Sequence, residues 1–384
     1  MAATTPSLFL HPNARVANPA LTPPDRAPLA FHQGFDRYAP TPLVDAPELA
    51  RLLRVKQVHL KVEAHRLGLP AFKILGASWA VYRAVRARLG VELDEWRTLE
   101  ELAGLLAPFR PMTLAAATDG NHGRAVAHMA ALLGFAARIY VPAGTAQARI
   151  DGIANEGARV EVIDGTYDDA VARSAQDASE NCLVISDTSW PGYEEVPRWV
   201  MEGYSTIFWE IDDELAARGE KGPSLVAVQF GVGALAAAVV NHYRHPTREM
   251  QPTILSVEPL HAACMLASME AGEIVTVPGP HDSIMAGLNC GRPSIVAWPL
   301  VSRSIDAFIA VSDDRARAAM RALARIGVVA GETGAAGLAG LLEVLCGSEN
   351  LNRRASLSVT EETRVLLIIT EGATDPEAYA EIVQ

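Results

Sequence analysis

Short apolar runs alternate with longer amphipathic stretches along most of the chain after residue 57. The apolar runs predict strands over Val58–Val62, Thr113–Thr118, Arg138–Pro142, Arg159–Ile163, Leu183–Ser186, Leu225–Gln229, Thr253–Glu258 and Val365–Thr370. The amphipathic stretches predict helices over Ser78–Leu89, Gly123–Leu133, Gln147–Glu156, from Asp168 onward and over Ala234–Tyr243. Repeated alternation of this kind is typical of α/β proteins with parallel-rich sheets flanked by helices.

Residues 1–40 have a weaker pattern and are rich in Pro and Ala, so we expect them to wrap over a surface. The chain has 384 residues, of which 49% are hydrophobic and 20% charged. This composition supports a sizeable core, and the length fits two domains or one large α/β unit. The formal net charge of −12 makes nucleic acid an improbable partner, because there is no excess of basic residues to neutralise phosphates.

Other features of the sequence indicate a cytoplasmic protein. No apolar run is long enough to span a bilayer, and the N-terminus has no basic segment followed by a long apolar stretch. The four cysteines, Cys182, Cys264, Cys290 and Cys346, form no C-x-x-C pair and no metal-ligand spacing. We therefore expect reduced thiols, no membrane partner and no metal.

Lys73 is the first residue with candidate chemistry. It lies in L-G-L-P-A-F-K-I-L-G, at Leu67–Gly76, among apolar residues and glycines. Burial there would disfavour the ammonium form and lower the pKa of the amine, and a neutral amine can attack an aldehyde to form a Schiff base. The alternative is a helix lysine whose stem covers apolar surface.

Two glycine-containing turns each follow a predicted strand and precede a predicted helix. The first is T-D-G-N-H-G at Thr118–Gly123, where Asp119 and Asn121 add polar groups at the carboxyl end of a strand. The second is Q-F-G-V-G-A-L at Gln229–Leu235, whose glycines and helix N-terminus suit a phosphate. Each turn also has a purely structural explanation, as a helix cap or as close packing of helix on strand.

Thr370 is the last residue of the predicted strand Val365–Thr370 and offers a neutral hydroxyl. Together with the amine, the anion cradle and the Asn121 amide, this set matches pyridoxal 5′-phosphate. Lys73 would take the aldehyde, Asn121 would face the ring hydroxyl and Thr370 the ring nitrogen. The phosphate would lie on the following residues: Gly231, Val232, Gly233, Ala234 and Leu235.

The order of these groups resembles that of the fold type II, tryptophan-synthase-type pyridoxal phosphate enzymes. Within them, D-G-T-Y-D-D at Asp164–Asp169 and the long segment S-D-T-S-W-P-G-Y-E-E-V-P-R-W-V-M-E-G-Y at Ser186–Tyr204 are similar to the diaminopropionate ammonia-lyase family. The resemblance runs from about residue 35 to the C-terminus. The family usually has F-G-L-N before A-F-K, whereas this chain has L-G-L-P, which leaves the substrate open but not the cofactor.

The resemblance implies that Asp119 and Asp187 join Lys73 as catalytic residues. Asp119 would take a Cα proton on the face opposite Lys73, so that both enantiomers react, and Asp187 would contact the distal amine of the substrate. The resemblance also implies a homodimer, and it places Cys264 and Cys290 near the active-site entrance, either paired or as free thiols.

We therefore predict a pyridoxal phosphate-dependent β-elimination on a 2-amino acid, with 2,3-diaminopropionate as the first candidate substrate. The alternative is a dehydratase that acts on a β-hydroxy amino acid such as serine, threonine or phenylserine, and a non-catalytic sensor on the same fold is a third possibility. We further predict two α/β domains with the cofactor between them. The large domain would comprise residues 1–76 and 191–384, and the small domain residues 77–190.

Overall fold

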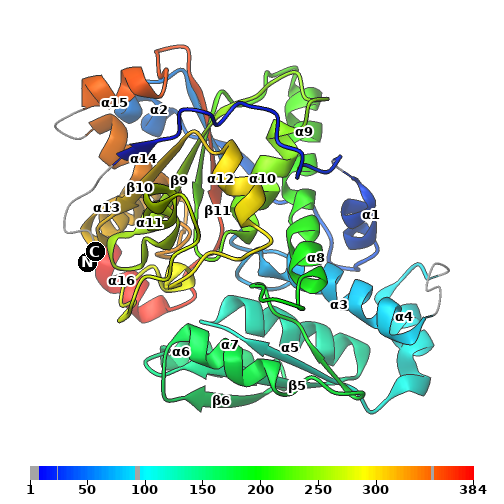
Figure 1. Cartoon of the computed structure of the whole chain (residues 1–384). Coiled ribbons are helices and arrows are strands. Elements are labelled where there is room, and N and C mark those ends of the chain that lie inside the picture. The colour runs from blue at the N-terminus through cyan, green and yellow to red at the C-terminus, as the bar shows by residue number, and fades with distance from the viewer. Residues whose placement is uncertain (1–7, 24, 91–95, 347–349) are drawn as a thin grey trace.

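The strands of the chain form two separate sheets in the computed structural model, which describes residues 8–23, 25–90, 96–346 and 350–384 (Figure 1). The larger sheet has the strand order β1-β10-β9-β8-β11-β3-β2, and the smaller has the order β6-β5-β4-β7. Neighbouring strands are parallel throughout, except that β1 and β2 pair antiparallel at the two edges of the larger sheet. The predicted α/β class is confirmed.

The larger sheet consists of β1 (Leu8–Leu10), β2 (Leu43–Asp45), β3 (Gln57–Val62), β8 (Leu225–Gln229), β9 (Thr253–Pro259), β10 (Ala307–Val311) and β11 (Arg364–Ile369). The smaller sheet consists of β4 (Thr113–Ala117), β5 (Ala136–Pro142), β6 (Arg159–Ile163) and β7 (Cys182–Val184). The helices are α1 (Ala27–Gln33), α2 (Pro47–Leu53), α3 (Lys73–Leu89), α4 (Leu99–Leu106), α5 (Asn121–Leu133), α6 (Gln147–Ala154), α7 (Tyr167–Ala175), α8 (Glu195–Gly203), α9 (Ser205–Arg218), α10 (Ala234–Arg244), α11 (Cys264–Ala271), α12 (Trp298–Ser304), α13 (Asp313–Arg325), α14 (Ala336–Cys346), α15 (Asn350–Ser356) and α16 (Pro376–Val383).

The core lies on both faces of the larger sheet. Along β11, Leu366 and Ile368 belong to one apolar cluster, and Val365, Leu367 and Ile369 belong to the other. Because successive side chains of a strand point to opposite faces, a strand that is apolar throughout needs cover on both sides. Residues of α10 complete the first cluster and residues of α14 the second, and these helices lie on opposite sides of the sheet (Figure 1).

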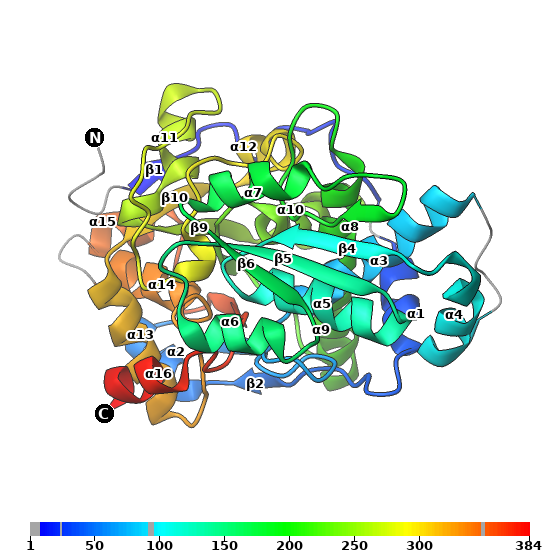
Figure 2. The ribbon, with the colours of Figure 1, turned by 90° about the horizontal axis from the view of Figure 1, so that it is seen from below.

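The smaller sheet lies below the larger one and carries α5, α6 and α7 (Figures 1 and 2). Its four strands all fall within residues 77–190, and the strands of the larger sheet fall outside that range. The two-domain division itself stays a prediction. Among the described residues, no helix is both long and apolar enough to cross a bilayer.

The bounds of the predicted elements lie within two residues of the observed ones, with one exception. The helix predicted to start at Ser78 starts at Lys73, because no polar capping side chain marks its first turn: Phe72 occupies the N-cap. The strand predicted over Leu183–Ser186 ends at Val184. Within the weakly patterned first forty residues, β1 adds an edge strand to β10 and α1 packs near α9. The first seven of those residues lie outside the described part.

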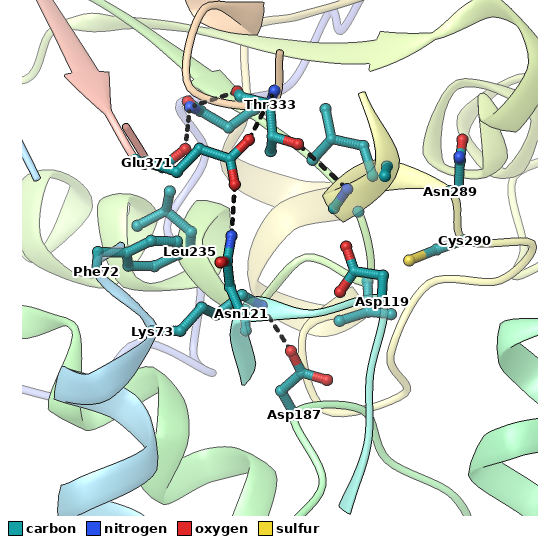
Figure 3. Close-up of a pocket in the computed structure, with 18 of the residues that line it drawn as sticks. Phe72, Lys73, Asp119, Asn121, Asp187, Leu235, Asn289, Cys290, Thr333 and Glu371 are labelled. Carbon is teal, nitrogen blue, oxygen red and sulfur yellow. Dashed lines mark hydrogen bonds and ion pairs between the residues drawn. The ribbon is translucent and has the colours of Figure 1, made fainter. Parts of the chain in front are cut away.

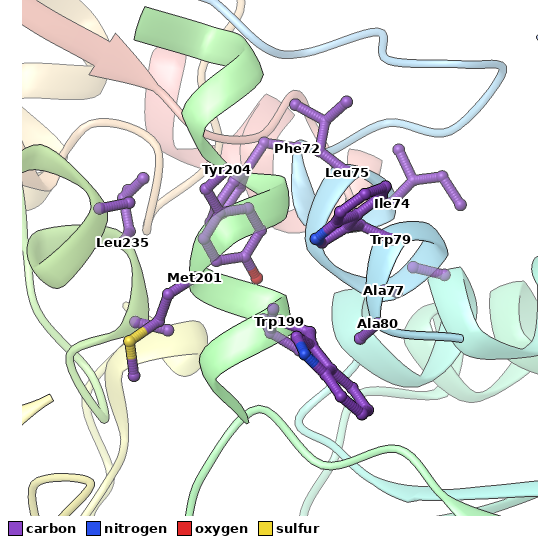
Figure 4. Packing of buried hydrophobic residues seen from close by; sticks show 14 of the residues in the cluster. Phe72, Ile74, Leu75, Ala77, Trp79, Ala80, Trp199, Met201, Tyr204 and Leu235 are labelled. Atoms are coloured by element: carbon purple, nitrogen blue, oxygen red, sulfur yellow. The ribbon is translucent and has the colours of Figure 1, made fainter. Parts of the chain in front are cut away.

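Helix α3, which begins at Lys73, crosses α8 at two glycines. A Cβ on Gly203 would lie 2.8 Å from the Cα of Gly76 and would also meet the carbonyl oxygen of Leu75. Around this crossing Phe72 packs against Tyr204, with ring centroids 4.6 Å apart, and Trp199 is buried beside them (Figure 4). The close approach fixes the helix that carries the candidate lysine against a segment about 120 residues away in the chain.

Candidate active site

The residues predicted to be functional meet in one pocket at the carboxyl ends of the parallel strands (Figure 3). Ten of the residues that line it are the predicted Lys73, Asp119, Asn121, Asp187, Gly231, Val232, Gly233, Ala234, Leu235 and Thr370. Both sheets contribute to this pocket. Asp119 and Asn121 follow β4 and Asp187 follows β7, whereas the glycine loop follows β8 and Thr370 follows β11.

Lys73 reaches the pocket because the chain turns sharply after β3. Arg66 and Leu69 bond to each other through both backbone amides, which closes a two-residue turn at Leu67 and Gly68, both with positive φ. The amide of Phe72 then donates to the carbonyl of Thr370 at 3.1 Å, and the amide of Gly372 donates to that of Pro70 at 3.0 Å. The segment before Lys73 is thereby attached to the end of β11.

The Lys73 amine forms an ion pair with Asp187, with Nζ 2.6 Å from Oδ2. The hydroxyl of Tyr167 donates to the other oxygen of Asp187 at 2.9 Å. Burial by itself lowers the pKa of Lys73, but Asp187, together with Tyr204 and Asp119, outweighs it and raises the pKa above its ordinary value. Burial likewise favours the neutral form of Asp187, yet Lys73 holds its pKa below the usual range. The expectation of a lowered lysine pKa was therefore wrong, because the sequence did not show the buried partner.

The glycine loop forms a cradle of backbone amides. Gly233 is the N-cap of α10 with φ +104°, a conformation that side chains disfavour. A Cβ on Gly231 would approach the carbonyl oxygen of Gly287 to 3.0 Å. The first amides of α10 have no partner inside the helix, so they point toward the pocket as donors for an anion.

Thr370 is held by a buried glutamine that the sequence analysis did not assign to the site. The amide nitrogen of Gln229 donates to the carbonyls of Thr333 and Ile368 and, at 3.0 Å, to the hydroxyl oxygen of Thr370. Because both carbonyl oxygens can only accept, the group of Gln229 that faces them and Thr370 must be the amide nitrogen, not the amide oxygen. Since Thr370 accepts from Gln229, its own proton remains available for an acceptor in the pocket.

Glu371 is the second functional candidate that the sequence analysis passed over, although it is next to Thr370. One of its carboxylate oxygens accepts from the side-chain amide of Asn121, and the other accepts from the backbone amide of Thr333 at 3.1 Å (Figure 3). Gly331 and Gly334 leave room for it, since a Cβ on either residue would meet Glu371 within 3.0 Å. Glu371 thus links the helix after β4 to the larger sheet.

Asp119 lies across the pocket from Lys73 in Figure 3. Burial raises the pKa of its carboxyl group, while Lys73 and Arg149 oppose that shift. His122 lies in the same turn but is not positioned as a base in the pocket. Its Nε2 lies 2.7 Å from the backbone carbonyl oxygen of Ile185. Cys264 and Cys290 are buried and free in the structure, so the pairing left open for them is not formed.

The donor set fits pyridoxal phosphate. An amine, a cradle of amides and a hydroxyl with a free proton match its aldehyde, its phosphate and its ring nitrogen respectively. The fit depends on the backbone at Gly231, which a side chain would obstruct, and on the Gln229–Thr370 hydrogen bond, which leaves Thr370 as a donor.

Comparison with known proteins agrees with this fit. The family model "Pyridoxal-phosphate dependent enzyme" matches residues 35–371, so the chain is a pyridoxal phosphate-dependent enzyme. It is 36% identical over 371 residues to the diaminopropionate ammonia-lyase of Salmonella typhimurium, covering 92% of this chain and 90% of that one. The structure of the diaminopropionate ammonia-lyase from Escherichia coli in complex with D-serine superposes with a TM-score of 0.90 at 34% identity and covers 99% of this chain and 97% of that one. The chain belongs to the diaminopropionate ammonia-lyase family.

A more distant relative represents the alternative activity. The biosynthetic L-threonine dehydratase of Mycobacterium leprae is 29% identical over 271 residues, which cover 69% of this chain and 57% of that protein. The likeness to the ammonia-lyases is both higher and more extended. It therefore favours the lyase over the dehydratase.

Proposed function

We propose that the enzyme converts 2,3-diaminopropionate and water to pyruvate and two molecules of ammonia. The observation that carries this proposal is the placement of two carboxyl groups, the buried Asp187 and the half-buried Asp119, in one pocket with the Lys73 amine. A substrate with a second amine needs a carboxylate near that amine, because an amine departs as ammonia only when it is protonated. A β-hydroxy substrate has no such requirement for an anionic partner.

Bound pyridoxal phosphate supplies an electron sink for the negative charge left when the Cα proton is removed. Thr370 would donate a hydrogen bond to the ring nitrogen without transferring its proton, which favours prompt β-elimination. Asn121 would face the ring hydroxyl, and the amides of Gly231–Leu235 would hold the phosphate. With the substrate bound to the cofactor, these three sets of contacts would position its Cα for Lys73 and Asp119.

Lys73 and Asp119 are the two bases for the Cα proton, one on each face of the substrate. Lys73, when free, takes the proton from one configuration at its Nζ, and Asp119 takes it from the other at a carboxylate oxygen. The Asp187 carboxylate, oriented by Tyr167, would pair with the distal ammonium of the substrate in place of Lys73. Lys73 would then be free to act as a base.

Pro70 belongs to L-G-L-P, the departure from the family's F-G-L-N that left the substrate open. Pro70 is not among the residues that line the pocket, and its carbonyl oxygen is bonded to the amide of Gly372. Pro70 therefore contributes no group to the pocket of this chain.

The decisive experiment measures both products from a panel of substrates. 2,3-Diaminopropionate should yield two ammonia per pyruvate, whereas serine yields one ammonia per pyruvate. We expect the highest kcat/KM for 2,3-diaminopropionate, above serine, threonine and phenylserine. A higher kcat/KM for any β-hydroxy amino acid would establish the dehydratase instead, and cofactor absorbance without 2-oxo acid from any of them would indicate a sensor.

The same proposal includes a cytoplasmic homodimer. The family resemblance supports the dimer, and four free cysteines suit a reducing compartment. The net charge of −12 gives no support for binding to nucleic acid. Light scattering of the purified enzyme tests the dimer.

A further inference from the structure

A second cavity lies next to the catalytic pocket. Asp119, Tyr167, Ala286 and Asn289 line both cavities, so the two share a wall. The second cavity is bounded on one side by the start of α6 and on the other by the loop before α14. Any amino acid held near Asp119 therefore lies within reach of groups in this second cavity.

Arg149, the third residue of α6, is the cation of that cavity. Its side chain is 10% exposed, and its stem packs on Gly120, where a Cβ would lie 3.1 Å from the Arg149 Cδ. Its guanidinium therefore lies beside the turn that carries Asp119. Among the described residues, Arg149 makes no side-chain hydrogen bond, and its Nε is buried without a partner.

The nearest carboxylate leaves Arg149 poorly satisfied. Glu332 Oε2 lies 3.8 Å from Arg149 Nη2, an ion-pair distance beyond the range of a hydrogen bond. A guanidinium has five N–H donors in a planar fork, and burying them without acceptors is costly. Arginines elsewhere in the chain show the contrast. Arg66, which is 1% exposed, bonds to both Glu63 and Glu210 at 2.6–2.8 Å.

The charges around Arg149 suit a zwitterionic ligand. Glu332 and Asp375 line the cavity and would attract ammonium groups, while Arg149 is its one arginine or lysine among the described residues. A carboxylate matches the guanidinium fork in two parallel hydrogen bonds. A free amino acid has both kinds of charge.

We propose that Arg149 binds the α-carboxylate of the amino-acid substrate. This inference rests on the proposed function, because it takes the substrate carbon to lie next to Asp119. Arg149 then selects for a free carboxylate and orients the amino acid, while Lys73 and Asp119 act on the adjacent Cα and Asp187 on the distal amine. The alternative is that Arg149 and Glu332 only form a latch between the smaller sheet and the larger one.

The test combines a protein change with a ligand change. Alanine and alaninamide both have the α-amine, but only alanine has the carboxylate, and neither has a β leaving group. Their binding to the holoenzyme is followed by the change in visible absorbance of the cofactor. The variants are Arg149→Gln and Arg149→Lys, with Arg124→Gln as the matched control. Arg124 also pairs with a glutamate, Glu156, at 3.0 Å, but it lines neither cavity.

We expect the wild type to bind alanine more tightly than alaninamide. In Arg149→Gln this preference should fall about tenfold to a hundredfold, the usual effect of losing a charged hydrogen-bonded pair. Comparing the ratio between variants cancels the different basicity of the two α-amines. KM for the reacting amino acid should rise by a similar factor with little change in kcat. Arg149→Lys should lie in between, and Arg124→Gln should match the wild type.

If both Arg149 variants keep the wild-type preference for alanine over alaninamide, the proposal is wrong. If they keep that preference but melt at a lower temperature, Arg149 serves only as the latch with Glu332. If Arg149→Gln does not fold, Arg149→Lys tests the proposal alone. It keeps the positive charge but lacks the two parallel N–H donors of the guanidinium, so the preference for alanine should still fall. The absorbance titration does not depend on turnover. Absence of pyruvate from 2,3-diaminopropionate would refute the proposed function, while the alanine pair would still test Arg149.

Discussion

The amine of Lys73 and the carboxylate of Asp187 lie 2.6 Å apart and join the first residue of α3 to the loop after β7. The two residues are 114 positions apart in the chain. Both are largely buried, with 18% and 7% of their side chains exposed. The pair therefore connects the two sides of the pocket, and loss of either partner would leave a buried charge unpaired.

Replacing Asp187 by Asn should destabilise the cofactor-free protein by about 3–5 kcal/mol at pH 7, because Lys73 is left without its buried partner. Since the folded pKa of Asp187 is lowered, the contribution of the pair is complete above the ordinary value of 3.8 and is lost as the pH falls toward the folded pKa. The difference between wild type and variant should therefore shrink below pH 4. Urea unfolding between pH 3 and 7 measures it, with the exposed Asp151→Asn as the control.

Lys73 should be the lysine that carries the cofactor. The chain has only four lysines, so borohydride reduction and peptide mapping give a clear answer. Lys61 is fully buried in an ion pair with Glu210, and Lys56 pairs with Glu362 at the surface. A label on Lys56, Lys61 or Lys221 would contradict the assignment.

Asp119→Asn should separate the two enantiomers of the substrate. If Lys73 and Asp119 act on opposite faces, turnover of the D-substrate should fall about 10²–10⁴-fold while the L-substrate still reacts through Lys73. Release of 2-oxo acid from each enantiomer measures this, and cofactor absorbance shows that binding is intact. Equal losses on both enantiomers would exclude a face-specific base. A wild type without D-activity would favour the dehydratase.

Glu371→Gln should weaken cofactor binding about tenfold to a hundredfold. Both groups that Glu371 accepts from, the Asn121 side chain and the Thr333 amide, are donors. The amide nitrogen of a glutamine must then face one donor, and rotating Asn121 to avoid this would change the group it presents to the ring hydroxyl. Titration of cofactor-free protein with pyridoxal phosphate gives the dissociation constant. The exposed Glu377→Gln serves as the control, and equal affinities in the two variants would show that Glu371 does not position Asn121.

Gly203→Ala should destabilise the enzyme by about 1–3 kcal/mol and reduce activity, because the added methyl group forces α8 away from α3. The methyl would lie 2.8 Å from the Cα of Gly76, three residues after Lys73. Gly104 in α4 has open space around it, so Gly104→Ala should be neutral or slightly stabilising. Thermal unfolding of both variants, with pyruvate release, makes the comparison. A stable Gly203→Ala variant with normal activity would show that the crossing tolerates movement.

Apart from Asp187 and the catalytic role of Asp119, which came from the family resemblance, the local pattern of the sequence was enough to predict the α/β class, the bounds of the elements it marked and the candidate residues. Each of these depends on residues near one another in the chain: apolar alternation over five or six positions, or glycines between a strand and a helix. The start of α3 was missed because Phe72 gives no capping signal. The cofactor was predicted from the order of Lys73, Asn121, the glycine loop and Thr370 along the chain. The family match confirms that prediction.

Contacts between distant segments were decided only by the tertiary structure. The sequence predicted a lowered pKa for Lys73 from its apolar neighbours, but Asp187, brought in from the other sheet, raises it. Likewise Asn121 and Glu371 are 250 positions apart, and no pattern around either indicates the other. Periodicity tells which face of an element is buried, whereas the packing of the two sheets determines which charges meet at their shared edge. The protonation of the lysine and the orientation of the groups that surround it follow from that packing.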